Sequence, residues 1–439
     1  MEPNQAKAQY EARLLALRGV VAVGCGTRKV KGVDTGQPCV AVLVKKKLPL
    51  ASLATGEVVP AALEGVPTDV VEAGEVMALP SASMSGVRRA DLLAPPFVGL
   101  RAPPTPALAL DVEAHRERHR PLVGGISCGP TNFGLSGTVG LPLVYMADGS
   151  ACLLSNTHVI APYWYNQGMQ PDWYEKHGIK VGAPIRQPSL ADGGTPEDYV
   201  AQLLEWAEIS PTAPNEMDAA IARLTVEASP ELLGLGDALS AALSLTKGLT
   251  KGEYGQMAEP ELGMVVRKSG RTSGVTEGKI AYTDLAIRVG YPFGEATFQG
   301  QVGIEPALLQ PGDSGSAILG AGNVVLALGF AGSRVMSVAT PIRRILERFG
   351  LRLTPPGTPV EVALASVQDR VRAVWGFDNR TKTWSLYDPG APQASDLKVL
   401  RDGQGYWIEV SGDAVLTHQG RTWPLYQGWN LIGWKEEGK

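Results

Sequence analysis

The stretch "LLQPGDSGSAIL", residues 308–319, places Asp313 and Ser314 between Gly312 and Gly315. Glycine, proline, aspartate and serine are common in tight turns, so the stretch by itself predicts a bend between two strands. A serine becomes nucleophilic only where a base takes its proton, a second group orients that base, and amide donors face the oxyanion. Residues elsewhere in the chain therefore decide between a turn and a nucleophile.

The bulk composition is that of a globular protein with more than one domain. The chain has 439 residues, 44% hydrophobic and 19% charged, which is more than one typical core supports. Its 52 glycines and 33 prolines favour a turn-rich, helix-poor architecture. The formal net charge of −4 gives no basic footprint for nucleic acid. The densest cationic run, residues 45–47, is interpreted as solvent-exposed charges that keep an edge strand from pairing with another chain.

Neither a secretory signal nor a membrane-spanning segment is visible in the sequence. The first twenty residues lack a basic start followed by an apolar region, and no apolar run approaches membrane-spanning length. These features predict a soluble chain with no membrane partner, cytoplasmic by default. The four cysteines are too few for a disulfide scaffold and are expected to be buried free thiols, although Cys25 and Cys39, or Cys128 and Cys152, could lie close together.

Residues 1–120 are predicted to form a small domain and a linker. Helical spacing over residues 4–18 precedes two strands, "GVVAVGCGTRKV" and "QPCVAVLVKKK", which indicates a small α+β domain over 1–80. The segment 81–120 contains "APPFVGLRAPPTPA", and proline at this density is typical of a linker.

The segment 121–353 is predicted to be an all-β region. It consists of many short apolar runs separated by glycine, asparagine, aspartate and proline, a pattern typical of a sandwich or barrel. Two stretches have helical spacing instead: 229–245, which would bridge two halves of the β region, and 342–351, which would close it.

The tail is predicted to be a separate Trp-rich β module. A proline-containing linker over 354–360 precedes residues 361–439, which hold six of the nine tryptophans. Exposed tryptophans can bind glycans, but a module this small without disulfides needs large aromatic side chains for its core, and the core interpretation is preferred. The six are Trp375, Trp384, Trp407, Trp423, Trp429 and Trp434.

The base for Ser314 must come from five histidines. Four of them, His115, His119, His177 and His418, lie in charged, polar or Trp-rich stretches. Only His158 ends an apolar strand, "ACLLSNTHVI", in the same β region as Ser314. A lone histidine there is more often a satisfied core residue, because an unpaired imidazole is costly at such a place. The positions of the other four nevertheless leave His158 as the candidate base.

The orienting acid must be a carboxylate that can be buried against the imidazole N–H. Most carboxylates of the region lie in polar loops, whereas Asp218, in "NEMDAAIARL", directly precedes an apolar strand. Alone it would be interpreted as a strand-start or capping aspartate. The chain order His158, Asp218, Ser314, each beside an apolar strand, is much more specific than any one of the three.

Three of these segments resemble those of the trypsin-like (chymotrypsin-fold) serine peptidases: "SNTHVI" at 155–160, "DAAIARL" at 218–224 and "GDSGSA" at 312–317. "GGISCG" at 124–129 and "VRKSGRTSGVTEGKI" at 266–280 are similar to bacterial members and plant relatives. The likeness covers about residues 120–350. The N-terminal stretch resembles the small leader domain that accompanies such peptidases, and the tail resembles a Trp-rich module appended to various bacterial proteins.

The resemblance implies a mainly β fold and a serine endopeptidase. The fold would be a double six-stranded β-barrel of chymotrypsin type with a small N-terminal α+β domain and a small C-terminal β module. His158 would take the Ser314 proton, Asp218 would fix the imidazole tautomer, and an acyl-enzyme intermediate would form. The backbone amides of Gly312 and Ser314 would form the oxyanion hole, and glycines at 312 and 315 let the loop turn tightly.

Substrate contacts are also implied by the resemblance. Leu308, six residues before the serine, would lie at the base of the P1 pocket. The stretch "GFAGS", 329–333, looks like the strand that pairs with the substrate backbone, through Phe330, Ala331 and Gly332. Because the pocket base is not an acid, an apolar or small P1 side chain is expected. Lys268 and Arg271 could attract a carboxylate, so an acidic P1 side chain stays open as an alternative.

Asp313 has two interpretations. Arg120 precedes "PLVGG", so cleavage there could free a new N-terminus to pair with Asp313, as in zymogen-activated members of the family. Proline after the arginine makes that bond a poor substrate. An aspartate that accepts turn hydrogen bonds is therefore the preferred interpretation.

An alternative to the enzyme is a peptide-binding or scaffold protein on a peptidase fold, with cleft access regulated by the N-terminal region. The additional domains motivate it, while the complete set of three residues argues against it. The sequence has no HExxH, no CxxC pair and no P-loop, so no metal and no cofactor is expected. The expected partner is a peptide or protein substrate.

Overall fold

The structure is a computed structural model that describes residues 1–78, 81–82, 112–131, 134–167, 169–235, 254–378, 383–401 and 403–435. The chain forms two compact units, Met1–Met146 with Ser150–Leu353, and Ala147–Gly149 with Thr354–Lys439. Strands dominate both units, so the predicted mainly β class is confirmed. In the described part of the chain, no helix is long and apolar enough to cross a membrane.

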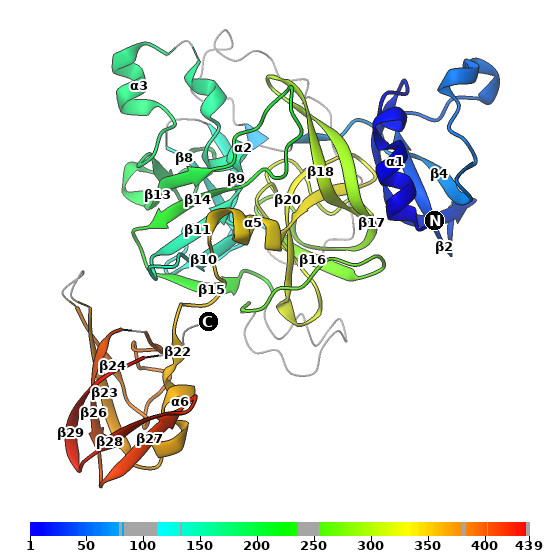
Figure 1. The fold of residues 1–439 in the computed structure, drawn as a ribbon. Coiled ribbons are helices and arrows are strands. Elements are labelled where there is room, and N and C mark those ends of the chain that lie inside the picture. The colour runs from blue at the N-terminus through cyan, green and yellow to red at the C-terminus, as the bar shows by residue number, and fades with distance from the viewer. Residues whose placement is uncertain are drawn as a thin grey trace. The chain divides into compact units, whose positions relative to one another are not determined.

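A closed six-stranded barrel lies at the centre of the larger unit (Figure 1). Its strand order is β16-β19-β20-β21-β18-β17, and the pairing of β16 with β17 closes the ring. All six pairings are antiparallel, and the interior is filled by branched aliphatic side chains such as Ile280, Ile304 and Leu326. The strands are β16 Val265–Gly270, β17 Gly274–Tyr291, β18 Gly294–Glu305, β19 Ala317–Leu319, β20 Val325–Gly332 and β21 Ser337–Pro341.

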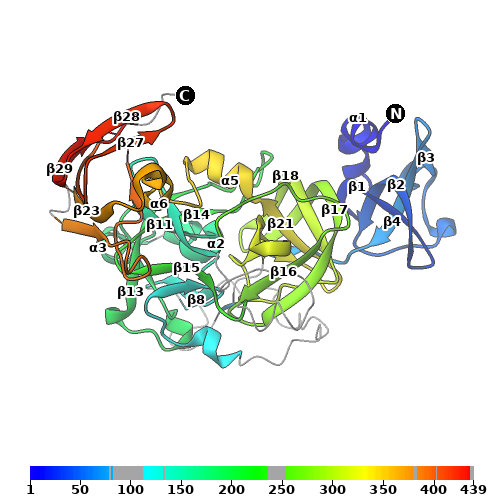
Figure 2. The same ribbon diagram turned by 90° about the horizontal axis from the view of Figure 1, so that it is seen from below.

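Another ring of strands precedes it in the chain and lies beside it (Figure 2). In chain order this ring is the first barrel, and the six-stranded ring is the second barrel. The order is β10-β11-β14-β13-β12-β8-β9, and only Val139 and Gly140 separate β9 from β10, so the ring returns to its start. The predicted double barrel is therefore confirmed, with seven strands in this ring where six were predicted. The strands are β8 Ser127–Pro130, β9 Leu135–Thr138, β10 Leu141–Tyr145, β11 Ala151–Ser155, β12 Pro184–Arg186, β13 Tyr199–Trp206 and β14 Ala220–Leu224; the helices beside them are α2 Thr157–Ile160 and α3 Pro171–His177.

The prediction of a helix over residues 229–245 is wrong for its first residues. Residues Ala228–Leu232 form strand β15, which pairs in parallel with β7, Leu122–Gly124. Pairing with a neighbouring strand here overrides the helical spacing of the apolar residues. Residues 236–253, which include the rest of that prediction, lie outside the described part of the chain.

The N-terminal elements, for which a small α+β domain was predicted, continue the sheet of the second barrel and belong to the larger unit. Strand β1 pairs with β2 on one side and with β17 on the other, and Figures 1 and 2 both show the N-terminal hairpin alongside β17. Helix α1 packs Ala6 and Leu14 against Val23 and Val42 of the two strands. The elements are α1 Pro3–Leu15, β1 Val20–Val30, β2 Val33–Val44, β3 Ala62–Leu63, β4 Val66–Glu72, β5 Met77–Ala78 and β6 Ser81–Ala82.

Residues 112–120, the end of the predicted linker, pack against the first barrel. Glu113–Arg116 form a 3-10 turn, and the buried ring of His115 lies with Nδ1 2.7 Å from the carbonyl oxygen of Gly125. All four cysteines are free and buried, as expected. Burial raises the pKa of Cys128 to about 12, so that thiol stays protonated at neutral pH.

The smaller unit is built on the antiparallel sheet β24-β23-β26-β29. Alternation along β26 turns Tyr406 and Ile408 into the core and leaves Trp407 outside. Its elements are β22 Thr358–Pro359, α6 Val360–Ala363, β23 Val371–Asp378, β24 Thr383–Tyr387, β25 Val399–Leu400, β26 Gly405–Val410, β27 Ala414–His418, β28 Arg421–Leu425 and β29 Gly428–Gly433.

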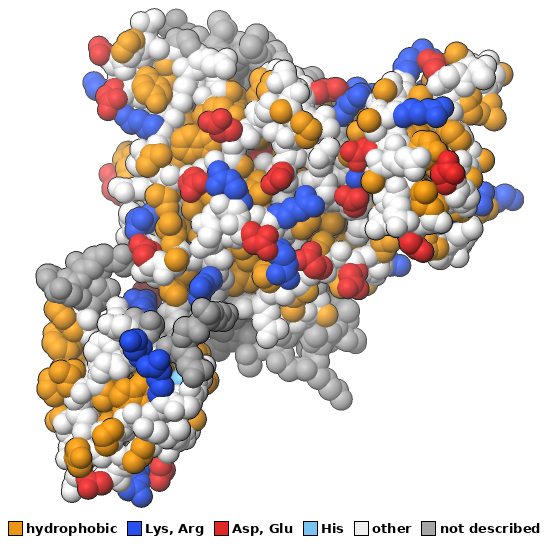
Figure 3. All heavy atoms as spheres, in the orientation of Figure 1, with side chains coloured by type: hydrophobic (Ala, Val, Ile, Leu, Met, Phe, Trp, Pro, Cys, Tyr) orange, Lys and Arg blue, Asp and Glu red, His pale blue; other side chains and the backbone are white. Residues whose placement is uncertain are grey.

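The tryptophans of this unit do not all build its core. Trp434 is 1% exposed and stacks on Trp423 with ring centroids 5.0 Å apart. In contrast, Trp384, Trp407 and Trp429 are 53%, 41% and 48% exposed. Figure 3 shows hydrophobic side chains along the left edge of this unit. The core interpretation holds for Trp434 and fails for the three exposed rings.

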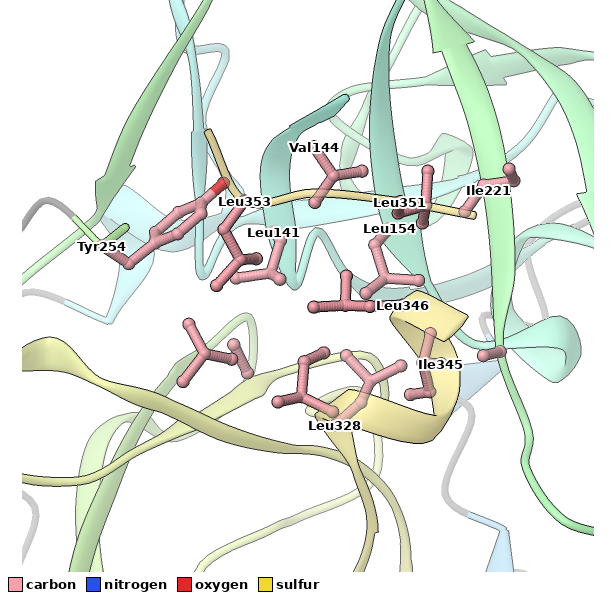
Figure 4. Packing of buried hydrophobic residues seen from close by; sticks show 14 of the residues in the cluster. Leu141, Val144, Leu154, Ile221, Tyr254, Leu328, Ile345, Leu346, Leu351 and Leu353 are labelled. Carbon is pink, nitrogen blue, oxygen red and sulfur yellow. The ribbon is translucent and has the colours of Figure 1, made fainter. Parts of the chain in front are cut away.

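A buried apolar cluster joins the two barrels (Figure 4). Leu141 and Leu154 come from the first barrel, Leu328 from the second, and Ile345 and Leu346 from helix α5, Ile342–Phe349. This helix is the predicted closing helix. Because the cluster fixes one barrel against the other, it also fixes any site that draws residues from both.

Ile345→Ala should lower the free energy of unfolding of the full chain by about 2–5 kcal/mol, because it leaves a cavity in this cluster. Chemical denaturation followed by tryptophan fluorescence measures the change. Glu347→Ala, on the exposed face of the same helix, is the control and should shift stability by less than about 0.5 kcal/mol. Equal effects of the two substitutions would contradict the role given to the cluster.

Candidate active site

His158 is held in place by the residues on either side of it. It lies in the short helix α2, which follows β11 after the single residue Asn156. The Asn156 side chain donates from Nδ2 to the carbonyl oxygen of Asp218 at 2.6 Å. The Thr157 hydroxyl lies 2.9 Å from the carbonyl oxygen of Ala219. These bonds tie α2 to the chain that leads into β14, so His158 and Asp218 are placed together by the backbone.

The structure brings His158 and Asp218 into direct contact. His158 Nδ1 lies 2.5 Å from Asp218 Oδ2, and since a carboxylate only accepts, this ring nitrogen carries the proton. The backbone N–H of His158 donates to Asp218 Oδ1 at 3.2 Å. Both side chains are buried. The carboxylate therefore fixes both the orientation and the tautomer of the imidazole, leaving Nε2 as the ring nitrogen able to accept a proton.

Tyr291 is a third member of this group, and sequence reasoning missed it. Its hydroxyl donates to Asp218 Oδ2 at 2.7 Å, and its ring meets that of His158 edge to face with centroids 6.1 Å apart. Burial and the Asp218 charge raise the pKa of Tyr291 well above its usual range, so it remains a donor. In the sequence it is only the last residue of a long strand, and no motif marks it. The nearest signal is a polar aromatic residue at a strand end.

Ser314 lies on a loop bonded to both barrels. Thr138 of the first barrel donates its backbone N–H to the Ser314 carbonyl at 2.8 Å and its hydroxyl to the Gly312 carbonyl at 2.9 Å. Gly315 and Gly312 have φ values of 94° and 100°. A Cβ on Gly315 would lie 2.3 Å from the Thr138 carbonyl oxygen, so the loop has no room for a side chain there.

The structure does not join Ser314 to His158. Ser314 Oγ donates to the Phe330 carbonyl at 3.2 Å, while His158 Nε2 is buried and has no hydrogen-bond partner among the described residues. Rotation about the Ser314 Cα–Cβ bond would turn Oγ away from the Phe330 carbonyl. Within the described chain, the amides of Gly312 and Ser314 donate to no other group, which leaves them available to an oxyanion.

Asp313, at the centre of the loop, pairs with an internal cation. Lys268 Nζ lies 3.1 Å from Asp313 Oδ2, and neither side chain is exposed. Amides of Gln310, Thr272 and Ser273 donate to the same carboxylate at 2.8 to 3.1 Å. Burial would raise the pKa of Asp313, but Lys268 and these donors hold it below its usual value. Asp313 therefore accepts turn hydrogen bonds, as the preferred interpretation predicts. It also has a role that the sequence did not predict, because it neutralises the buried Lys268.

The other residues named from the sequence lie as follows. Arg271 donates from Nε to Asp192 Oδ2 at 2.8 Å, so both cations considered for an acidic substrate are committed to buried carboxylates. Leu308 packs in the core of the second barrel, and its N–H donates to the hydroxyl of Ser337 at 3.0 Å. Arg120 bonds Gln187 with its guanidinium. The described residues contain no group of three or more histidine, cysteine or acidic side chains able to hold a metal.

No protein-family model and no curated protein sequence matches the chain. Solved structures do match about half of it. A glutamic-acid-specific serine protease covers 53% of this chain and 100% of its own, with 20% identity and a TM-score of 0.35. A Nocardiopsis protease covers 52% and 97%, with 17% identity and a TM-score of 0.33. Cellulomonas bogoriensis chymotrypsin covers 53% and 98%, with 20% identity and a TM-score of 0.33. Because these scores are low, the function proposed below rests on this chain's own residues.

Lys268→Met should cost about 3–5 kcal/mol of unfolding free energy, because it leaves Asp313 charged, buried and unpaired. Asp313→Asn should destabilise in the same way, and the double variant should cost less than the sum of the two. Denaturant unfolding of all four chains measures the coupling. Additive losses would show that the pair does not act as a unit.

The same variants test a pH dependence. The lowered pKa of Asp313 means that its contribution to stability is present above the ordinary carboxyl pKa of 3.8 and is lost as pH falls through the lower, folded value. Unfolding free energy measured from neutral pH downwards should therefore fall less steeply below about pH 5 in the double variant than in the parent. Identical profiles would contradict this account.

Proposed function

We propose that the chain is a serine endopeptidase in which Ser314 is the nucleophile, His158 the general base and Asp218 the group that orients it. One observation carries the proposal. A buried carboxylate holds an imidazole through Nδ1, and the other ring nitrogen is left without a partner in the described chain, at a junction where Thr138 bonds the Ser314 loop. A buried imidazole prepared in this way has no evident structural purpose.

The proposed reaction starts with rotation of Ser314 Oγ from the Phe330 carbonyl towards His158 Nε2. Nε2 takes the hydroxyl proton as Oγ attacks the substrate carbonyl carbon, and Asp218 stabilises the resulting imidazolium. The carbonyl oxygen becomes an oxyanion bound by the amides of Gly312 and Ser314. His158 then gives its proton to the leaving amine, and water hydrolyses the acyl-enzyme by the reverse sequence. Loss of one oxyanion donor typically costs about 10²–10³ in kcat, so the Gly312 conformation matters as much as the base.

The proposed substrates are peptides with an apolar or small P1 side chain. The proposal follows from Leu308, which supplies no carboxylate for a basic side chain, and from Lys268 and Arg271, whose charges are paired inside the protein. Phe330, Ala331 and Gly332 are the proposed backbone contacts.

A peptide-binding protein without catalysis is the second candidate. It is favoured by the bond from Ser314 to the Phe330 carbonyl and by the burial of Ser314 and His158, which are 0% and 1% exposed. Reactivity of Ser314 separates the two candidates, because binding alone needs no activated hydroxyl.

A fluorophosphonate probe should label the full chain at Ser314, and Ser314→Ala should abolish labelling because it removes the proposed nucleophile. Gel fluorescence and peptide mass mapping measure the site. Ser366→Ala, an exposed serine in the smaller unit, is the control and should label as the parent does. Labelling that survives Ser314→Ala would overturn the assignment of the nucleophile.

Tyr291→Phe should lower kcat by roughly 10- to 100-fold with little change in KM, because a hydrogen bond to a charged group is worth about 1.5–3 kcal/mol. The substitution removes one donor to Asp218 and leaves the aromatic ring in place. Tyr163→Phe is the matched control, since that hydroxyl donates to a backbone carbonyl, of Ile209, and not to Asp218. A change confined to KM, or equal effects of both variants, would contradict a positioning role for Tyr291.

A further inference from the structure

A two-residue strand from the N-terminal domain lies in the candidate site. Strand β5 pairs with β20 in the antiparallel direction, with Met77 opposite Gly332 and Ala78 opposite Ala331. Its other side pairs with β17, where Gly290 N–H donates to the Val76 carbonyl at 3.0 Å. The segment thus completes a sheet between the ends of two strands of the second barrel.

The edge of β20 that β5 occupies is the one next to Ser314. Strand β19 pairs with β20 only as far as Leu328, while β21 covers the opposite edge as far as Gly332. The carbonyl of Phe330, between these points, accepts the Ser314 hydroxyl. An extended peptide that approaches the nucleophile can therefore pair with Ala331 and Gly332, and in this structure β5 does so.

The direction of β5 leads towards Ser314. Because the pairing is antiparallel, β5 runs from Gly332 towards Phe330 and so towards Ser314. Strand β6 then pairs with β9 of the first barrel, the strand whose Thr138 N–H donates to the Ser314 carbonyl. The two strand contacts flank residues 79 and 80, which lie outside the described part of the chain. The chain therefore makes backbone contacts on both barrels beside the nucleophile, as a bound substrate would.

The domain that carries β5 is anchored to the same barrel. Besides the β1–β17 ladder, Lys7 forms an ion pair with Asp284 at 3.0 Å, and Arg288 donates to the Leu15 carbonyl at 2.9 Å. Val76, directly before β5, and Ala78 within it are buried.

The side chain of Met77 packs against Gly290 of β17. A Cβ on Gly290 would lie 2.5 Å from Met77 Sδ, so a side chain at 290 would compete for the space that the thioether occupies. The N-terminal domain thus delivers a packed strand to the edge of β20.

We propose that Met77–Ala78 is a built-in occupant of the peptide-binding edge of β20, and that a substrate binds there only after displacing it. This proposal rests on the proposed function in taking Ser314 as the nucleophile, but occupancy of the edge can be measured without catalysis. The ligand class is an extended peptide bound by its backbone, antiparallel to Ala331 and Gly332.

A tethered strand competes at a high effective concentration, so the affinity for an added peptide falls in proportion to the free fraction of the edge. If the edge is free in about one molecule in ten or fewer, release of β5 should tighten peptide binding by at least about tenfold.

The first experiment measures binding in the full chain with Ser314→Ala. The release variant is Met77→Pro/Ala78→Pro, in which the two N–H groups of β5 are lost. The probe is a fluorescein-labelled peptide with the sequence of residues 73–78, AGEVMA, followed by anisotropy. It should bind the release variant at least about tenfold more tightly than the parent. Lys46→Pro, at an exposed position of the same domain, is the control and should bind as the parent does. Equal affinities in all three chains would overturn the proposal.

The second experiment locks the strand in place. Ala78→Cys/Ala331→Cys joins two residues that face each other across the ladder. The oxidised chain should react with a fluorophosphonate at least about tenfold more slowly than the same chain after reduction. Equal rates in the two redox states would overturn the proposal while leaving Ser314 as the nucleophile. No labelling of any variant, together with tighter peptide binding by the release variant, would overturn the proposed catalysis and leave the role of β5 in place.

Discussion

The Asp218 carboxylate is buried, so its charge is tolerated only because donors converge on it. They are the ring and backbone N–H groups of His158 and the hydroxyl of Tyr291. Two of these donors come from His158 in α2, beside the first barrel, and the third comes from Tyr291 at the end of β17 of the second barrel. The need to satisfy this carboxylate therefore couples the two barrels at the candidate site, and the apolar cluster around α5 makes the coupling rigid.

A second buried carboxylate, Asp313, does for the nucleophile loop what Asp218 does for the base. Its partner is Lys268, from β16 of the same barrel, and three backbone amides and the Ser273 hydroxyl also donate to it. The loop shape that leaves the Gly312 and Ser314 amides unpaired in the described chain thus depends on an ion pair already inside the fold. Such a pair is strongly destabilising when one partner is removed, which links the geometry of the loop to the stability of the barrel.

The fold class and the contact of His158 with Asp218 were predictable, because short apolar runs bounded by glycine and proline indicate strands and because few histidines compete for the role of base. Tyr291 and Lys268 were not assigned these roles, since which buried polar groups meet is decided by barrel closure over long sequence separations. The helix predicted over 229–245 failed where β15 found a partner strand. The tryptophans were predicted as core residues, but strand alternation alone does not say which face of a sheet is covered, and Trp384, Trp407 and Trp429 are exposed. Nothing in Met77 or Ala78 signals that β5 reaches β20.

Three features meet in the candidate site: an imidazole held by Asp218, the Ser314 hydroxyl turned to the Phe330 carbonyl, and strand β5 on the adjacent edge of β20. The central claim is that Ser314 and the amides around it form one reactive centre. A crystal structure of the protein after reaction with a fluorophosphonate tests it most directly. The account predicts phosphorus bonded to Ser314 Oγ, with the phosphoryl oxygen within hydrogen-bond distance of the Gly312 and Ser314 amides. An adduct on another residue, or a phosphoryl oxygen turned away from both amides, would contradict it.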